Sequence, residues 1–337
     1  MFGTDIGIDL GTANILVCVK GKGLVICEPS VIAMNLDTSK IVAIGEEARK
    51  MIGRTPGNIK AIRPLKDGVI ADYEITASIL KYSIHKVCGK PLFSKPRVVV
   101  CVPSGGTDVE KRAVLEAVAQ AAAKEVYLIS EPMAAAIGCG LDISAPSGNM
   151  VIDIGGGTTD VAVISLNGEV VSESIRIGGY HFEEAIIRYI KRTYNIAIGE
   201  STAEEIKIEI GTVYPKPTMR MTVRGLDLVS GLPSNIEISA LDVYKAFEEP
   251  VKSIIQLIKD VLEITPPELA ADIIRKGMML TGGGALLRGF DMLIEEETGV
   301  PVQVPNDPLT CVARGTEEVL KNLNKIKNTS ILLSRKF

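Results

Sequence analysis

The chain carries the same short pattern in both of its halves, and this repetition constrains the fold more than any other feature. Residues 6–14 read IGIDLGTAN and residues 150–160 read MVIDIGGGTTD. In each segment an apolar run ends in an aspartate, Asp9 or Asp153, and a glycine and threonine turn follows. An apolar run then resumes, ILVCV after the first turn and VAVIS after the second. The pattern predicts one β-hairpin with a small-residue turn in each half.

Size and composition indicate a soluble protein of two domains. The 337 residues exceed one compact core, since domains average ~150 residues. The net charge is −4 and no Lys/Arg block stands out, so we expect no nucleic-acid partner. No apolar stretch approaches the ~20 residues that span a bilayer, and the first strand begins too early for a signal peptide. Scattered cysteines without a CxxC pair indicate a reducing cytoplasm and argue against a zinc site: Cys18, Cys27, Cys88, Cys101, Cys139 and Cys311.

Apolar periodicity predicts alternating strands and helices. Capping boxes of Thr107 with Glu110, and of Thr202 with Glu205, mark two helix starts. An α/β protein with mixed sheets and two related halves follows, with a ligand site between the halves at the carboxyl ends of strands. The expected strands are 6–10, 15–19, 24–28, 31–35, 97–102, 150–154, 161–166, 169–177 and 278–280. The expected helices are 108–124, 181–193, 203–210, 241–263 with an interruption at Pro250, and 268–276.

The first glycine turn has two interpretations. Small residues at Gly11 and Ala13 let backbone N–H groups approach phosphate oxygens, and Thr12 and Asn14 add side-chain donors. Asp9, at the strand end, is suited to hold Mg²⁺ through water. The alternative is an ordinary hairpin turn with an Asx contact.

The second turn favours the functional interpretation. Three successive glycines, Gly155, Gly156 and Gly157, cost backbone entropy, and chain reversal alone rarely needs three. We interpret the turn as a second phosphate clamp opposed to the first. Asp153 and Thr158 are then placed to contact a γ-phosphate, a metal or an attacking water.

Two weaker candidates lie further along the chain. Residues 281–289 read TGGGALLRG, which predicts a strand, a glycine loop and a helix N-terminus that accepts an anion or a flat ring. Glycine is, however, common at any such turn. Glu204 and Lys207 share a helix face at i, i+3, for which a surface ion pair is the alternative.

Two other motifs have both a functional and an ordinary interpretation. Glu131 precedes Pro132, which fixes the direction of its side chain at a helix start and suits it to orient a hydrolytic water. A capping or surface glutamate is the alternative. The loop 90–96 places Leu92 and Phe93 between lysines, as at a membrane interface, unless both side chains pack into the core.

These motifs, in this order, resemble the superfamily of actin, sugar kinases and heat-shock chaperone ATPases. Nearly the whole chain is similar to one branch, the MreB/Mbl family of bacterial actin homologues. The resemblance implies an actin-like, duplicated ribonuclease H-like fold of two lobes around a central nucleotide cleft. The segments that carry it are IGIDLGTAN, EPSVIA, GRTPGNI, RPLKDGVIADYE, EPMAAAIG, DIGGGTTDVAVIS, TPPELAADI and LTGGGALLRG.

The resemblance also implies lobe boundaries, ligands and partners. Lobe I would span 1–148, with a small subdomain near 33–68 and with 316–337 returning to it; lobe II would span 149–315, with a small subdomain near 182–243. The expected ligands are ATP and Mg²⁺, with slow hydrolysis coupled to polymerisation. The expected partners are further copies of the chain in paired antiparallel protofilaments, the inner membrane surface and the cell-wall elongation machinery. The protein would be cytoplasmic and peripheral on the inner face of the membrane, where it maintains rod shape.

Residue roles follow from the resemblance position by position. The phosphates would be held by Gly11, Thr12, Ala13 and Asn14 and by Gly155, Gly156, Gly157 and Thr158. Ribose and adenine would be held by Glu204, Glu205, Ile206 and Lys207 and by Gly283, Gly284, Ala285, Leu286 and Leu287. Catalysis would fall to Glu131, Asp153 and Thr158, and Mg²⁺ to Asp9 and Asp153 through water. Leu92 and Phe93 match the family's membrane-inserting loop.

The chain departs from the family pattern at one position near the expected nucleotide site, and two other functions stay open. The family pattern has aspartate where this chain has Tyr180, so we expect slower hydrolysis than in relatives with the aspartate. A small-molecule kinase of the same superfamily needs an acceptor pocket and a base, usually with larger insertions. A soluble chaperone-type ATPase normally carries a peptide-binding domain, whereas only about twenty residues follow Gly315.

We predict that changing Leu92 and Phe93 together to serine abolishes co-pelleting with liposomes and leaves ATP binding intact. Insertion into a lipid interface depends on apolar side chains, whereas the predicted nucleotide turns lie elsewhere in the sequence. Unchanged co-pelleting of the double variant would contradict the membrane interpretation of this loop.

Overall fold

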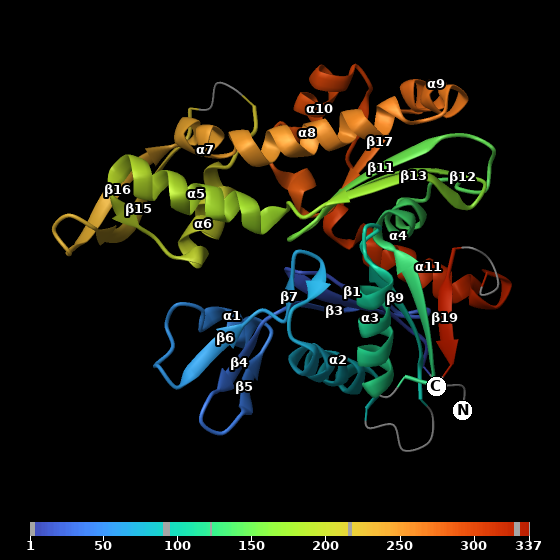
Figure 1. The fold of residues 1–337 in the computed structure, drawn as a ribbon, viewed down its shortest axis with the longest axis horizontal. Coiled ribbons are helices and arrows are strands. Elements are labelled where there is room, and N and C mark those ends of the chain that lie inside the picture. Colours follow the sequence, from blue (N-terminus) through green and yellow to red (C-terminus); the bar gives the residue numbers. More distant parts are fainter. Residues whose placement is uncertain (1–3, 90–94, 122, 215–217, 327–330, 337) are drawn as a thin grey trace.

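The computed structural model describes residues 4–89, 95–121, 123–214, 218–326 and 331–336, and two mixed sheets form its body. Figure 1 shows one sheet in the lower half of the view and the other in the upper half. The first sheet has the order β19-β10-β9-β1-β2-β3. Its strands are β1 (Ile6–Leu10), β2 (Asn14–Val19), β3 (Gly23–Pro29), β9 (Arg97–Val102), β10 (Glu125–Ser130) and β19 (Leu333–Lys336).

The second sheet repeats the topology of the first. Its order is β13-β12-β11-β17-β18. In each sheet a three-stranded antiparallel meander is followed by parallel strands, and both meanders have a register shift, at Val17/Cys18 and at Val163/Ile164. The predicted duplication of the hairpin is therefore confirmed. The strands are β11 (Asn149–Ile154), β12 (Thr159–Ser165), β13 (Gly168–Ile175), β17 (Met278–Thr281) and β18 (Val302–Gln303).

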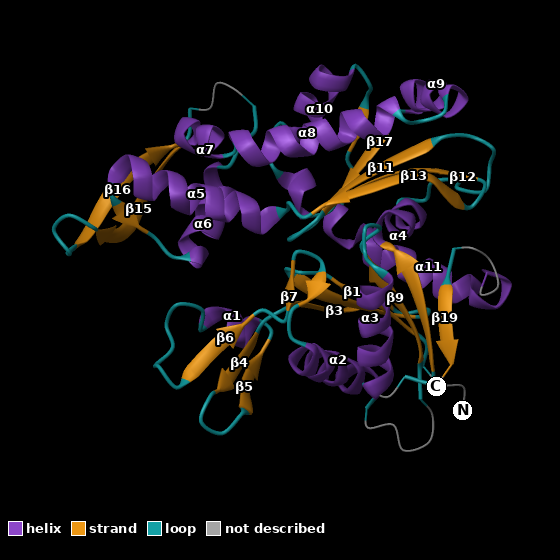
Figure 2. Ribbon diagram, viewed as in Figure 1, coloured by secondary structure: helices purple, strands orange, loops and turns teal. Residues whose placement is uncertain are grey.

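Smaller sheets extend from each half (Figure 2). The first half carries β4 (Ile32–Asn35), β5 (Lys40–Ile44) and β6 (Ile59–Ile62), and the short pair β7 (Leu65–Lys66) and β8 (Val69–Ile70). The second half carries β14 (Ile196–Ala197), β15 (Arg220–Asp227) and β16 (Pro233–Ser239). The helices are α1 (Glu46–Lys50), α2 (Tyr73–Cys88), α3 (Asp108–Gln120), α4 (Glu131–Gly138), α5 (Gly179–Tyr194), α6 (Glu200–Ile210), α7 (Ala240–Ala246), α8 (Glu248–Glu263), α9 (Pro267–Lys276), α10 (Phe290–Thr298) and α11 (Cys311–Ile326), with 3₁₀ turns η1 (Gly283–Leu286) and η2 (Pro308–Thr310).

Helices α4 and α11 pack together between the two main sheets. Their apolar side chains share one buried cluster with residues of β9 and β10 from the first sheet and of β11 and β12 from the second. Two glycines allow the helix backbones to touch. A Cβ at Gly138 would lie 1.9 Å from the Cys311 carbonyl oxygen, and one at Gly315 would lie 1.8 Å from the Ala134 carbonyl oxygen. This contact fixes how the two halves of the molecule meet.

Local sequence signals account for several helix boundaries. Thr107 and Glu110 form the predicted capping box, with both reciprocal hydrogen bonds present. The break predicted around Pro250 is confirmed as a restart, since α7 ends at Ala246 and Pro250 lies in the first turn of α8. Proline is tolerated there because N–H groups of the first turn have no intrahelical partner.

Two boundary predictions are wrong. The Thr202–Glu205 capping box does not form, because α6 begins at Glu200 after Gly199 and Thr202 lies inside its first turn. The third glycine loop does not open a helix directly. It continues as η1, and α10 begins only at Phe290.

Among the residues described, the six cysteines are free and no helix combines the length and apolar character needed to cross a membrane.

We predict that Gly315→Ala destabilises the protein by about 2 kcal/mol or more, because the added methyl group overpacks the α4–α11 contact. Helix propensity alone predicts the opposite, a gain of about 1 kcal/mol for alanine over glycine. The sign of the change in unfolding free energy, measured by denaturant titration, therefore separates the two effects. Gly57→Ala is the matched control, since a Cβ at Gly57 has no neighbouring atom within 4 Å. Equal or greater stability of Gly315→Ala relative to this control would contradict the packing argument.

Candidate functional site

A cavity of about 390 Å³ lies where the turn ends of the two main sheets face each other. All three glycine turns contribute to its wall, together with residues of α4, α5, α6, α1 and η2. The lining residues from the turns are Asp9, Gly11, Thr12, Ala13, Asn14, Asp153, Gly155, Gly156, Thr158, Gly282, Gly283, Gly284, Leu286 and Leu287. The sequence prediction of a site between the two halves is consistent with this position.

The first two turns are in direct contact. A Cβ at Gly156 would lie 2.6 Å from Cβ of Ala13, and one at Gly157 would lie 2.7 Å from Oγ1 of Thr12. The glycines of the second turn are therefore required by the close approach of the two halves. Thr12 also accepts a hydrogen bond from the Gly68 amide at 3.0 Å, which ties the short β7–β8 hairpin to the same point.

The third turn packs on the second. Gly282 adopts φ +79°, a left-handed conformation that glycine adopts readily. A Cβ at Gly284 would lie 2.3 Å from Cγ2 of Ile154. Thr281, which precedes Gly282, donates a hydrogen bond from Oγ1 to Asp153 Oδ1 at 3.0 Å. Gly282, Gly283 and Gly284 of this turn line the cavity without side chains.

Four carboxyl groups lie close together at this site. Asp9, Glu131 and Asp153 line the cavity, with Asp9 half-buried, and the buried Asp160 pairs with Asp153 across the β11–β12 hairpin. Burial raises the pKa of Asp9 to about 7, with a smaller contribution from the charge of Asp153. Burial likewise raises the pKa of Asp153 to about 6 and that of Asp160 to about 7. The pKa of Glu131 is raised well above its usual range, by burial first and then by the charges of the three aspartates. Each group therefore favours a nearby positive charge.

Asp160 is the member of this cluster that the sequence reasoning missed. It lies directly opposite Asp153 in the β11–β12 register, and like charges paired across strands are destabilising. Its Oδ1 accepts a hydrogen bond from the Ser104 amide at 2.8 Å, while Oδ2 is buried without a hydrogen-bond partner. The hairpin register, counted outward from the glycine turn, was the signal that could have found it.

These residues fit a divalent cation held mainly through water and ligand oxygens. Asp9, Glu131 and Asp153 present carboxyl oxygens to the cavity, and Oδ2 of the neighbouring Asp160 is buried without a hydrogen-bond partner. Among the residues described, no group of three or more His, Cys, Asp or Glu side chains is arranged to hold a metal directly. Mg²⁺ suits this arrangement, because it keeps several waters and is usually bound through one or two carboxylates and substrate phosphates.

Some of the predicted site residues line the cavity and others do not. Among those predicted to hold ribose and adenine, only some line it. Glu204 and Lys207 line it, whereas Ile206 is fully buried in the core and Glu205 points to solvent. Gly157 and Ala285 are also absent from the lining. Four consecutive helical residues cannot all face one side of a helix with 3.6 residues per turn.

The alternative interpretations of the charged residues are corrected. Glu131 is neither a surface nor a capping side chain, since it is buried and makes no capping hydrogen bond at the start of α4. The Glu204–Lys207 surface pair does not form. Lys207 pairs with Glu183 from α5 at 2.5 Å, which is 6% exposed. Leu92 and Phe93 lie outside the described residues, so the membrane-loop interpretation stays a prediction.

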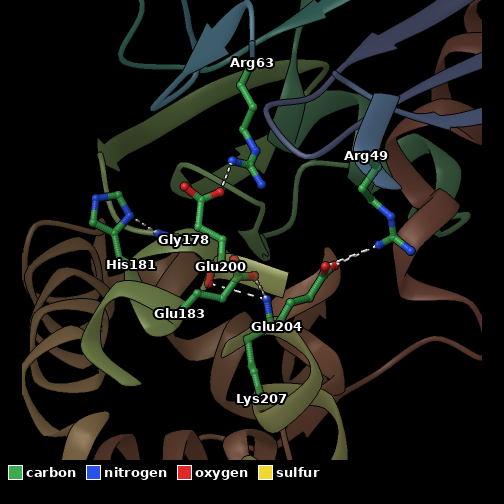
Figure 3. A network of polar contacts seen from close by, with 9 residues as sticks. Arg49, Arg63, Gly178, His181, Glu183, Glu200, Glu204 and Lys207 are labelled. Carbon is green, nitrogen blue, oxygen red and sulfur yellow. Dashed lines mark hydrogen bonds and ion pairs between the residues drawn. The ribbon is translucent and has the colours of Figure 1, made fainter. Parts of the chain in front are cut away.

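Figure 3 shows a polar network that the sequence did not reveal. Four of its residues, Arg49, Arg63, Glu204 and Lys207, line one part of the cavity, which we call its mouth. Arg49 of α1 contacts Glu204 at 3.2 Å, and Arg63, which follows β6, pairs with Glu200 at the start of α6. The Arg63 guanidinium carbon also lies 4.6 Å from the centroid of the Tyr180 ring. These partners are more than 100 residues apart in sequence, so no local pattern could pair them.

Comparisons with known proteins agree over nearly the full length. A protein-family model described as MreB/Mbl protein matches residues 3–328. The cell shape-determining protein Mbl of Bacillus subtilis is 55% identical over 97% of this chain and 98% of its own length. The structure of MreB 5 of Spiroplasma citri bound to AMPPNP superposes with a TM-score of 0.92 at 40% identity, over 97% of this chain and 99% of that one. A MamK double helical filament shares the fold at a TM-score of 0.80, with 22% identity over 94% of this chain and 98% of that one.

We predict that the ligand-free protein loses stability as the pH rises from about 4 to about 7. The pKa values of Asp9, Asp153 and Asp160 are raised on folding, so the native state binds more protons than the unfolded state in this window and the unfolding free energy falls with pH.

The dependence of stability on pH is measured as the change in melting temperature between about pH 4 and about pH 7, without nucleotide or divalent cation. Asp160→Asn removes one titrating group and should flatten the slope, whereas Glu296→Gln, at an exposed position, should leave it unchanged. A slope of the opposite sign, or equal slopes for both variants, would contradict the burial argument.

Proposed function

Because this chain belongs to the MreB/Mbl family, we propose that it is an ATP-dependent, actin-like filament protein that determines cell shape. The observation that carries the proposal is the contact between the two glycine turns at the wall of a cavity lined by Asp9, Glu131 and Asp153. Backbone turns of this kind present N–H groups to phosphate oxygens, and the acids supply the counter-charge for a cation. The AMPPNP bound to MreB 5, whose fold superposes on this one, supports a nucleotide as the ligand.

The proposed arrangement of the nucleotide follows the cavity wall. Gly11 to Asn14 and Gly155 to Thr158 hold the phosphates between the two halves. Glu204 and Lys207 on one side, and the bare turn Gly283–Gly284 with Leu286 and Leu287 on the other, hold the ribose and adenine. Leu286 and Leu287 provide an apolar surface for the base. In this proposal lobe I spans 1–148 plus 316–337, and lobe II spans 149–315.

We assign hydrolysis to Glu131 with Thr158 and Asp153. Glu131 lies among Asp9, Asp153 and Asp160, and burial together with their charges raises its pKa, which makes it a stronger base toward a water proton than an exposed glutamate. Thr158 offers a hydroxyl from the second turn to orient that water. Asp9 and Asp153 would hold Mg²⁺ through water, and the ion would supply positive charge against the phosphates. The enzymatic activity is weak and serves filament turnover.

The proposal extends to assembly and location. Filaments of paired antiparallel protofilaments would lie on the inner face of the membrane and organise the cell-wall elongation machinery. The family membership supports this role, since the Bacillus subtilis relative is a cell shape-determining protein. The shared fold of the MamK double helical filament is compatible with self-association along one axis.

We predict that electron microscopy on a lipid monolayer shows paired filaments with Mg²⁺–ATP and dispersed protein without nucleotide. Glu131→Gln should bind ATP and still assemble, but release phosphate about 100-fold more slowly, because it loses the proton-accepting group. Glu248→Gln is the matched control, an exposed glutamate in the first turn of α8. It should behave as the unmodified protein in both assays.

Two results would contradict the proposal. Dispersed protein in both conditions, with ATP bound, would indicate a soluble ATPase or small-molecule kinase of the same fold. Equal phosphate release by Glu131→Gln and Glu248→Gln would remove Glu131 from catalysis while leaving the assembly proposal standing.

A further inference from the structure

Two contacts join the halves of the molecule across the mouth of the cavity. Both arginines come from the small unit around β4, β5 and β6, and both glutamates come from α6 in the opposite half. Glu200 and Glu204 are four residues apart and share one face of α6. Figure 3 shows the two arginine side chains reaching across to this face from separate elements. Two points of contact on one helix face bear on both the separation and the relative rotation of the two units.

The charges of this contact have partners on both sides, which makes it reversible. Arg49 also contacts Glu46 of its own helix, with Nε 3.1 Å from the carboxylate. Lys207 is the cation on α6 nearest Glu204 in sequence, but it forms its ion pair with Glu183. Opening the mouth would therefore leave Arg49 with one carboxylate rather than none. The side chains of Arg49 and Glu204 are 45% and 35% exposed, and those of Arg63 and Glu200 are 27% and 52% exposed. Pairs open to solvent on at least one side shift an equilibrium by about fivefold at most.

Tyr180 links this contact to the second glycine turn. Its ring lies beneath the Arg63 guanidinium, while its backbone amide donates to the Gly156 carbonyl at 2.9 Å. The preceding Gly179 amide donates to the Gly155 carbonyl, also at 2.9 Å. Burial raises the pKa of the Tyr180 hydroxyl, so the ring stays neutral and the contact with Arg63 is a cation–π interaction. Arg63 thus connects Glu200 at the mouth with the turn proposed to hold phosphate.

We propose that Arg49, Arg63, Tyr180, Glu200 and Glu204 form a latch across the mouth of the cavity that slows the release of nucleotide. This inference rests on the proposed nucleotide binding and adds the residues that control exit. The inference also gives Tyr180 a role of its own. The family pattern has an aspartate at this position. In this chain Glu200 balances the charge of Arg63, and the Tyr180 ring covers the face of the Arg63 guanidinium group. The latch acts on dissociation and not on the chemistry of hydrolysis.

The test is the dissociation rate of a fluorescent ATP analogue, measured by stopped flow with excess unlabelled Mg²⁺–ATP and dilute protein without lipid. Glu200 does not line the cavity, so Glu200→Gln probes the latch without altering a contact with the ligand. We expect dissociation about threefold faster for Glu200→Gln, and about tenfold faster when Arg49→Gln is added, in line with exposed ion pairs. Tyr180→Phe keeps the ring and should match the unmodified protein, whereas Tyr180→Leu should release the analogue about threefold faster.

Two controls separate the latch from a loss of structure. Glu297→Gln breaks the exposed Lys259–Glu297 pair between α8 and α10, far from the mouth, and should not change the rate. The charge reversal Glu200→Arg combined with Arg63→Glu should dissociate more slowly than Glu200→Arg alone, since the ion pair is restored. Melting temperatures of all variants should match that of Glu297→Gln.

Equal dissociation rates for the unmodified protein, Glu200→Gln and Tyr180→Leu would overturn the latch while leaving nucleotide binding established. Failure of the unmodified protein to bind the analogue at any concentration would instead overturn the proposed function, and with it this inference.

Discussion

The close contact of two glycine turns is the constraint on which the rest of the structure depends. Each turn ends a hairpin in one half, and Gly156 and Gly157 bring the second turn onto Ala13 and Thr12 with no room for a side chain. Because Asp9 and Asp153 each lie one residue before the end of the strand that enters its turn, the same contact brings carboxyl groups together. Burial of these acids raises their pKa values. Binding a cation and phosphates would relieve that electrostatic cost.

The two ends of the interface between the halves differ in physical character. At one end, α4 and α11 touch through Gly138 and Gly315 inside a core shared by both sheets, and a movement there would open buried apolar surface. At the other end, the halves meet through exposed ion pairs, of which Arg49–Glu204 is one. Exposed pairs contribute little individually. We therefore expect the packed α4–α11 contact to resist relative movement of the halves more strongly than the ion pairs at the mouth.

Local pattern predicted part of the framework of the fold, but not the helices α2, α10 and α11. The duplicated hairpins, the strand 97–102 and the capping box at Thr107 each follow from neighbouring residues, and each is present. The strand β10 was missed, although it lies between β9 and the returning β19. Its six-residue run EVYLIS is short, and periodicity alone does not separate such a run from a buried helix segment.

The site was predictable only where it was built from turns. Asp9, Asp153, Thr12 and Thr158 lie in the cavity wall because a tight turn leaves few directions for its side chains. On α6 the apolar residues Ala203, Ile206 and Ile210 face the core. Glu204 and Lys207 therefore reach the cavity and Ile206 does not. Contacts such as Arg63 with Tyr180 depend on how two halves meet, which no local pattern contains.

The central claim is that opposed turns and buried acids form one site for a nucleotide together with a divalent cation. Isothermal titration calorimetry of ATP binding, with Mg²⁺ and with a chelator, tests it most directly on the unmodified protein and on Asp153→Asn. The account predicts binding with Mg²⁺, much weaker binding with the chelator, and loss of most of that difference in the variant. Equal affinity for ATP with Mg²⁺ and with the chelator, unchanged in Asp153→Asn, would contradict it.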